Sequence, residues 1–181
     1  MLGAPPWAPG ASLPLRTMIL LGINGGLGNN DVASIPIHAF DLDAGWLDFA
    51  REKTAIDRRI PLWLETIAAV REWLTVRPEP ADEKHAGLLF ITKYGQPWSI
   101  ENRSLSNEMR KLLDSLGING HRNFYTLRHT FQTIADECRD FIAVRKIMGH
   151  STKDIADDYR EIISDQRLRD AAGFVRKWLF G

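Results

Sequence analysis

Apolar residues recur with helical spacing along most of this chain and with strand spacing in one short region. The run "LRTMILLGI" predicts a helix that starts near Leu13. In residues 37–62, short β-prone runs are separated by turn signals at Ala44 and Gly45 and again at residues 54–57, which predicts a three-stranded antiparallel meander. Residues 63–76 return to helical spacing, and a polar loop broken by prolines follows them.

The second half of the chain, from about Glu101 onward, has the pattern of consecutive helices. We expect them at residues 102–116, 125–137, 141–148, 153–160 and 165–179. These elements predict an α+β domain that is mainly helical, with a small three-stranded antiparallel sheet near its N-terminal side. Residues 1–12 are rich in proline, glycine and alanine and lack periodicity, so a poorly ordered lead-in is expected before one domain over residues 13–181.

The amino-acid composition indicates which kinds of binding partner and which cellular location to expect. The chain has 181 residues, 44% of them hydrophobic, which is enough for one domain with a real core. Lys and Arg together number 23, as do Asp and Glu, so a surface that attracts nucleic acid requires local segregation of charge. Cys138 has no second cysteine to pair with, no secretory signal pattern is present, and no apolar run approaches the ~20 residues of a membrane helix. We therefore expect a cytoplasmic protein without a membrane partner.

The stretch "LGINGGLGNND", residues 21–31, raises the question of what its glycines do. Gly26 and Gly28 fit the first two glycines of a dinucleotide-binding G-x-G-x-x-G, but Asp31 stands where the third is needed. A carboxylate there repels a phosphate near a helix start, and the chain lacks the βαβ alternation that accompanies this motif. Two other interpretations are open: the glycines end the preceding helix and turn the chain, or the loop has lost a residue that does chemistry.

A second stretch, "FYTLRHTFQTIADE", separates into two helical faces. Leu127 and Phe131 belong to an apolar face that packs, whereas Tyr125 and Arg128 share a neighbouring face that we expect to be free for chemistry. Further along, "IMGHSTKDIADDYRE" places a glycine at the end of a helix and a tyrosine nine residues after the histidine.

Taken in order, these motifs resemble the catalytic half of the tyrosine recombinase (phage integrase) family. The matching features are "TLRHTF", then "MGHS" with His150, then Tyr159. Upstream, "REKTAIDRRIPL" is similar to the second and third strands of the family, with Lys53 on the turn, and "GGLGNNDVASI" falls where the family has G-x-R-x-x-E. The resemblance covers nearly everything from about Leu13 to the end. It implies site-specific integration or recombination of double-stranded DNA, by strand cleavage and rejoining through a 3′-phosphotyrosine intermediate.

The chemistry of phosphodiester transfer explains the roles that the resemblance implies. The reaction needs cationic donors on the non-bridging oxygens, an in-line nucleophile and a proton for the leaving oxygen. By resemblance, Arg128 and His150 bind the phosphate, Lys53 protonates the leaving 5′ oxygen, and Tyr159 is the nucleophile. No metal and no nucleotide cofactor is implied, and the other histidines lack metal-ligand spacing or a partner cysteine.

Two positions depart from the family pattern. Gly28 occupies the place of the first arginine, and Tyr125 the place of the histidine that opens H-x-x-R. Losing one preorganised donor costs about 10²–10³ in rate, so a weakened enzyme is expected unless another arginine replaces the missing one. The candidates for that role are Arg51, Arg58, Arg59 and Arg122. Arg122 is also expected in the DNA-binding surface with Arg128, Lys53 and His129, and His129 is expected to brace the loops around Arg128.

Two other functions stay open on the sequence alone. Single arginines, lysines or tyrosines are mostly solvated surface residues, so only the ordered set favours an enzyme. A catalytically impaired DNA-binding remnant of the same fold would form no covalent adduct. A helical protein-interaction module would have no affinity for duplex DNA.

The two ends of the chain carry separate expectations. The family's catalytic domain follows a helical DNA-clamping domain that has no counterpart here, so the chain is expected to be a fragment. The final helix aligns apolar residues on one face, which predicts a homo-oligomer assembled on DNA, with covering of the chain's own core as the alternative. The residues expected in that contact are Leu168, Val175, Trp178 and Leu179.

Overall fold

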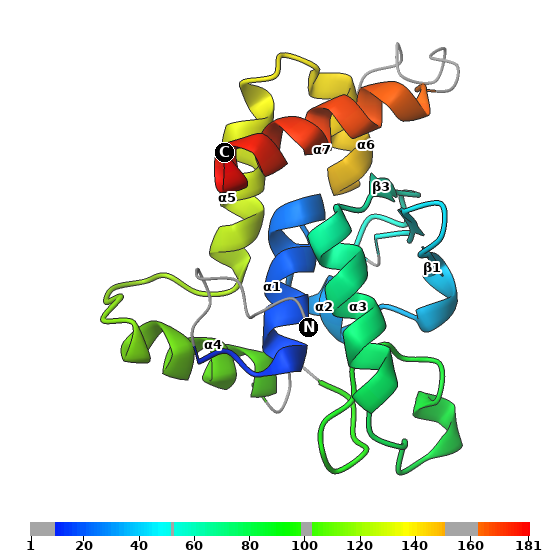
Figure 1. The fold of residues 1–181 in the computed structure, drawn as a ribbon, viewed down its shortest axis with the longest axis vertical. Coiled ribbons are helices and arrows are strands. Elements are labelled where there is room, and N and C mark those ends of the chain that lie inside the picture. Colours follow the sequence, from blue (N-terminus) through cyan, green and yellow to red (C-terminus); the bar gives the residue numbers. More distant parts are fainter. Residues whose placement is uncertain (1–9, 52, 99–102, 151–162) are drawn as a thin grey trace.

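The chain folds into a mainly helical domain with a small sheet at one side (Figure 1). The computed structural model describes residues 10–51, 53–98, 103–150 and 163–181. In that part of the chain the elements are α1 (Leu13–Gly25), α2 (Asn29–Ser34), the 3₁₀ helix η1 (Ile37–Ala39), β1 (Phe40–Asp41), β2 (Trp46–Asp48), β3 (Arg59–Pro61), α3 (Leu64–Val76), the 3₁₀ helix η2 (Glu83–His85), α4 (Ser104–Ser115), α5 (Tyr125–Asp136), α6 (Phe141–Met148) and α7 (Asp165–Phe180). The predicted mainly helical α+β class is confirmed. The helix expected at residues 153–160 and most of the lead-in lie outside the described residues.

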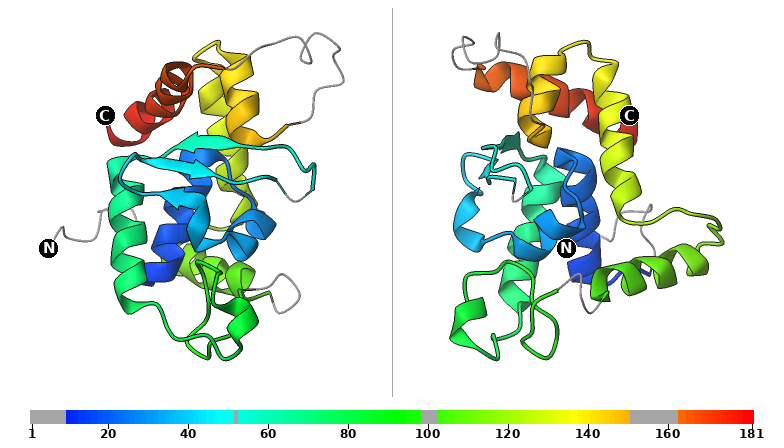
Figure 2. Two further views of the ribbon diagram at one scale, coloured as in Figure 1. Left: turned by 90° about the vertical axis from the view of Figure 1, so that its right-hand side faces the viewer. Right: turned by 180° about the vertical axis from the view of Figure 1, so that it is seen from behind.

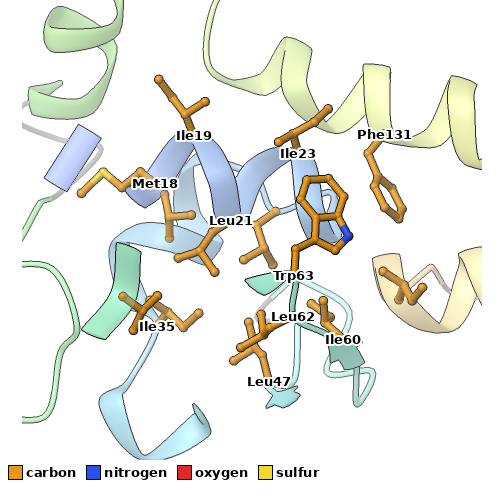
Figure 3. Packing of buried hydrophobic residues seen from close by; sticks show 14 of the residues in the cluster. Met18, Ile19, Leu21, Ile23, Ile35, Leu47, Ile60, Leu62, Trp63 and Phe131 are labelled. Carbon is orange, nitrogen blue, oxygen red and sulfur yellow. The ribbon is translucent and has the colours of Figure 1, made fainter. Parts of the chain in front are cut away.

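α1 is the centre of the core, with α3 along one side and α5 along the other (Figure 1). All of its residues from Thr17 to Gly25 are buried, as expected of a helix that is apolar on every side. Figure 3 shows its side chains meeting residues of the sheet and Phe131 of α5. Gly22 permits the close approach of α5, because a Cβ at this position would come within 3.0 Å of the Leu127 side chain.

The sheet is the predicted antiparallel meander, with strand order β1-β2-β3. Leu47 pairs with Phe40 on one side and with Ile60 on the other. The buried Asn24 at the end of α1 fixes the exit from β3, since its amide donates to the Pro61 carbonyl and its oxygen accepts from the Trp63 N–H, both at 2.9 Å. β3 contacts α6 and α7, which lie beyond the sheet from α3 (Figure 2).

α7 covers the chain's own core. Leu168 and Val175 are 1% and 0% exposed, because the apolar face of α7 packs against α5, α6 and β3. The Trp63 indole also donates to the Ala172 carbonyl at 3.0 Å, which ties α7 to the start of α3. The expectation that Leu168 and Val175 face a partner is therefore wrong for this structure. Trp178 is 51% exposed and does not share their buried face, and Leu179 is half-buried.

Of the helices in the described part of the chain, none has both the length and the apolarity needed to cross a lipid bilayer.

Candidate active site

The glycine loop joins α1 to α2 and sets one wall of the site. Gly26 ends α1 in the left-handed conformation, at φ +62°, which glycine adopts without steric cost. Gly28 precedes α2 in an extended conformation, at φ −93°, and its N–H donates to the Asp31 carboxylate at 2.7 Å. The interpretation that the glycines end a helix and turn the chain is thus confirmed, and Asp31 is bound within its own loop.

Arg128 is buried in α5, not exposed on a free face, which corrects the expectation from the sequence. The residue is 2% exposed. Its guanidinium donates to the carbonyls of Gly26 and Met148, the latter at 3.0 Å. These carbonyls lie at the C-terminal ends of α1 and α6, where unpaired backbone oxygens favour a cation. An arginine has five N–H donors, and among the described residues these two carbonyls are the acceptors of Arg128. Burial, followed by the charge of Arg51, lowers the pKa of Arg128.

Arg58 is a second buried guanidinium, directly before β3. Its Nη2 donates to Asp31 at 2.9 Å, and its Nε donates to the Phe49 carbonyl at 3.0 Å. The side chains of the Arg58–Asp31 pair are 0% and 7% exposed. Burial lowers the pKa of Arg58, and Asp31 acts in the opposite direction. Removing only one partner of a charge pair this deeply buried strongly destabilises the fold, because the other charge is left buried without a partner.

The end of α6 meets the turn that carries Lys53. Gly149 ends α6 at φ +63°, and its carbonyl accepts from Thr54 Oγ1 at 3.1 Å and from Arg51 Nη1 at 3.5 Å. A Cβ on Gly149 would lie only 2.9 Å from Arg58 Cγ and Cδ. The β2–β3 turn, the buried Arg58 and the residue before His150 are therefore packed together.

His150 follows directly after Gly149, beside this group of arginines. Burial, then the charges of Arg128, Arg51 and Arg145, lower the pKa of His150 to about 4. The imidazole is therefore neutral near pH 7, with one N–H donor and one nitrogen acceptor.

Tyr125 and Gly28, the two departures from the family pattern, lie against each other. A Cβ at Gly28 would be 3.3 Å from Cε2 of Tyr125 and 3.4 Å from the Asp31 carboxylate. The Tyr125 ring also packs edge-on against His129, one turn further along α5, at 5.0 Å between ring centroids. Tyr125 is 39% exposed.

The remaining candidates divide between the site and the surface. Lys53 is exposed on the turn whose neighbours Arg51 and Thr54 contact Gly149. Arg122 is exposed in the loop before α5 and donates to the Asn119 carbonyl at 3.1 Å. Tyr159 lies outside the described residues. Among the residues that the structure describes, no three His, Cys, Asp or Glu side chains gather in a way that could hold a metal ion.

The arginines that were candidates to replace the missing one also lie in different environments. Arg58 and Arg51 join the group around Arg128 and Gly149. Arg59 points outward and forms ion pairs with Asp48 at 2.7 Å and Asp165 at 2.8 Å. The signal for this difference is present in the sequence, because alternate residues of a strand face opposite sides and Arg58 shares the inward side with Ile60. What the sequence does not indicate is that Thr54 and Arg51 bind Gly149.

A model described as the phage integrase family matches residues 8–165. This chain belongs to that family. Tyrosine recombinase XerC of Salmonella typhi is 25% identical over 148 residues, which are 81% of this chain and 48% of that protein. XerC of Escherichia coli O1:K1 / APEC matches with the same identity and coverage. The chain thus spans about half the length of these curated relatives.

Solved recombinase structures share the fold of this chain. The XerH site-specific recombinase bound to its difH substrate matches with a TM-score of 0.62 and 21% identity, over 89% of this chain and 46% of that one. The Tn1549 transposon integrase in complex with a circular intermediate DNA matches with a TM-score of 0.67 and 16% identity, over 91% of this chain and 60% of that one. The prediction of a fold like the catalytic domain of tyrosine recombinases is confirmed.

Proposed function

We propose that this chain is the catalytic part of a recombinase that cleaves and rejoins double-stranded DNA at specific sites, through a covalent bond between Tyr159 and a 3′ phosphate. The observation that carries the proposal is the buried Arg128, which is held between the ends of α1 and α6 beside His150. A buried guanidinium held by backbone carbonyls, with more N–H groups than the two carbonyls accept among the described residues, is suited to a phosphodiester, whose oxygens accept two parallel hydrogen bonds from such a fork. Membership of the phage integrase family supports the same substrate.

Residues of this chain can then supply the nucleophile, the proton and the hydrogen bonds that each step of the reaction needs. Tyr159 loses its phenolic proton to solvent and its oxygen attacks phosphorus, the bond from phosphorus to the 5′ oxygen breaks, and the leaving oxygen takes a proton from Lys53. Arg128 and His150 donate to the non-bridging oxygens, where negative charge grows in the transition state. In the second step a 5′ hydroxyl gives its proton to Lys53 and attacks the phosphotyrosine, which rejoins the strand and releases the Tyr159 oxygen, which is reprotonated from solvent. A bound phosphate also favours protonation of His150, because its negative charge opposes the effect of the arginines.

The test traps the covalent intermediate. The full chain is incubated with a pool of duplexes that carry a randomised centre and a nick, and DNA that stays linked to protein after boiling in detergent is recovered and sequenced. The unmodified chain should yield linked DNA, while Tyr159→Phe should bind duplex equally well and yield none, because it lacks only the hydroxyl. Linked DNA from Tyr159→Phe would place the nucleophile elsewhere. Duplex binding without any linked DNA would indicate a DNA-binding remnant.

We propose further that copies of the chain assemble on DNA through the exposed part of α7, at Phe174 and Trp178. These side chains are 38% and 51% exposed and are adjacent on successive turns. Trp178→Ser should reduce multimeric complexes on duplex DNA, as seen by mass photometry, without lowering the melting temperature. Leu168→Ala is the control that lowers the melting temperature, since Leu168 is buried in the chain's own core.

A further inference from the structure

Arg58 has a buried N–H group that nothing in the described part of the chain accepts. Its Nη2 and Nε are bonded to Asp31 and to the Phe49 carbonyl, but Nη1 is buried without a hydrogen-bond partner. Leaving a buried donor unpaired costs about 1–3 kcal/mol, and more when the group is charged. Such a group in a folded protein requires an explanation, and a ligand that accepts the hydrogen bond is one.

Arg58 and Arg128 both contact the same two segments of the chain, and we call the boundary between these segments the seam. The seam lies between residues 26–31, at the start of α2, and residues 148–149, at the end of α6. Arg128 bridges it by donating to the carbonyls of Gly26 and Met148. Arg58 bridges it by pairing with Asp31 on one side and passing under Gly149 on the other. The two guanidinium groups are therefore neighbours at one place in the fold.

The electrostatics of the seam favour an anion. The charges of Arg51 and Arg58 both lower the pKa of Arg128, and Arg51 also lowers that of Arg58. Asp31 is the carboxylate that acts on both buried arginines, and its two oxygens are already occupied by Arg58 and by the Gly28 N–H. A ligand that brings negative charge and free acceptor oxygens would relieve the repulsion and accept from Nη1 of Arg58.

We infer that Arg58 is the second arm of a two-arginine clamp that binds the non-bridging oxygens of the scissile phosphate together with Arg128. This inference rests on the proposed function. It also accounts for Gly28, because a guanidinium that reaches the seam from the residue before β3 replaces one that residue 28 lacks. The Tyr125 ring lies against Gly28, 3.3 Å from where a Cβ would be, so a side chain at residue 28 would be in tight contact with this ring.

The first experiment measures the response of both arginines to phosphate in the unmodified chain. Inorganic phosphate is titrated into ¹⁵N-labelled protein, and the side-chain Nε–H signals of Arg58, Arg59 and Arg128 are followed by NMR. We expect the signals of Arg58 and Arg128 to shift together with one dissociation constant, while that of the outward-facing Arg59 does not move. A shift of Arg128 with no shift of Arg58 overturns the inference, whatever the variants below do.

The second experiment separates the clamp from a purely structural role of the ion pair. Arg58→Met combined with Asp31→Asn removes both charges, and removing both partners of a buried pair is commonly neutral for stability. A structural role therefore predicts normal formation of the DNA adduct, whereas the clamp predicts a loss of about 100- to 1,000-fold in its rate. Arg59→Met, one position along β3, is the matched control and should leave the rate unchanged.

The outcomes distinguish this inference from the proposed function. A folded double variant that forms adduct within about threefold of the unmodified rate overturns the clamp but leaves the recombinase function standing. If the unmodified chain forms no adduct while Arg58 and Arg128 both respond to phosphate, the recombinase function fails and the anion clamp stands. If the double variant does not fold, the phosphate titration of the unmodified chain decides alone.

Discussion

Gly149→Ala tests the packing that joins the end of α6 to the buried Arg58. Gly149 has φ +63°, and a Cβ there would lie 2.9 Å from Arg58 Cγ and Cδ and 3.0 Å from Arg51 Cβ. The Arg58 side chain cannot move aside at little cost, because Asp31 and the Phe49 carbonyl hold its guanidinium. An added methyl group therefore meets both backbone strain and a fixed neighbour.

The expected loss of stability is the sum of these two effects. A left-handed conformation costs a residue with a Cβ roughly 1–2 kcal/mol. Overpacking a methyl group in a filled interior typically costs about 1–3 kcal/mol. The free energy of unfolding should fall by about 3 kcal/mol, which lowers the melting temperature of a chain of this size by about 6–12 °C.

Gly117→Ala is the matched control, because it isolates the strain. Gly117 has φ +69°, but nothing lies within 4 Å of its Cβ position. Urea denaturation should therefore show a loss of about 1–2 kcal/mol for this variant, smaller than that of Gly149→Ala. Equal losses for the two variants would show that Arg58 does not pack under Gly149, and the geometry of the seam would have to be redrawn.

Three further predictions concern charge. Asp31→Asn should lower the free energy of unfolding by about 3–5 kcal/mol in urea denaturation, because it leaves Arg58 buried without its charge partner; Asp43→Asn, at an exposed ion pair, should cost less than about 1 kcal/mol. Stability should decrease as the pH falls from 6.5 to about 4, because burial and nearby arginines lower the pKa of His150 to about 4 and the unfolded chain takes up that proton first; a pH profile that His150→Gln fails to flatten would contradict this. Lys53→Ala should reduce the slope of log Kd against log salt for duplex DNA by about 0.9 at an unchanged melting temperature, and an unchanged slope would remove Lys53 from the DNA surface.

The sequence is sufficient to predict elements whose signals are local. The bounds of α6 are those predicted, because Asp140 accepts from the Ala143 N–H at its start and Gly149 ends it in a left-handed conformation. The short α2 was not predicted, because it depends on the bond between the Asp31 carboxylate and the Gly28 N–H within a loop dominated by glycines. The direction of the apolar face of α7 could not be predicted either, since helical periodicity is the same whether the face meets its own core or a second copy.

The candidate site is harder to predict than the helices, because the residues that contact each other in it are far apart in the sequence. Helical spacing places Arg128 near Tyr125, but it does not show that the ends of α1 and α6 supply carbonyls that hold Arg128 inside the protein. In the sequence, Gly28 and Tyr125 are two separate losses, each of which weakens a phosphate site. In the structure they are one contact, since the Tyr125 ring lies 3.3 Å from where a Cβ at residue 28 would be. Two changes that touch each other beside an intact Arg128 and a buried Arg58 are better explained as one rearrangement of the site than as two independent defects.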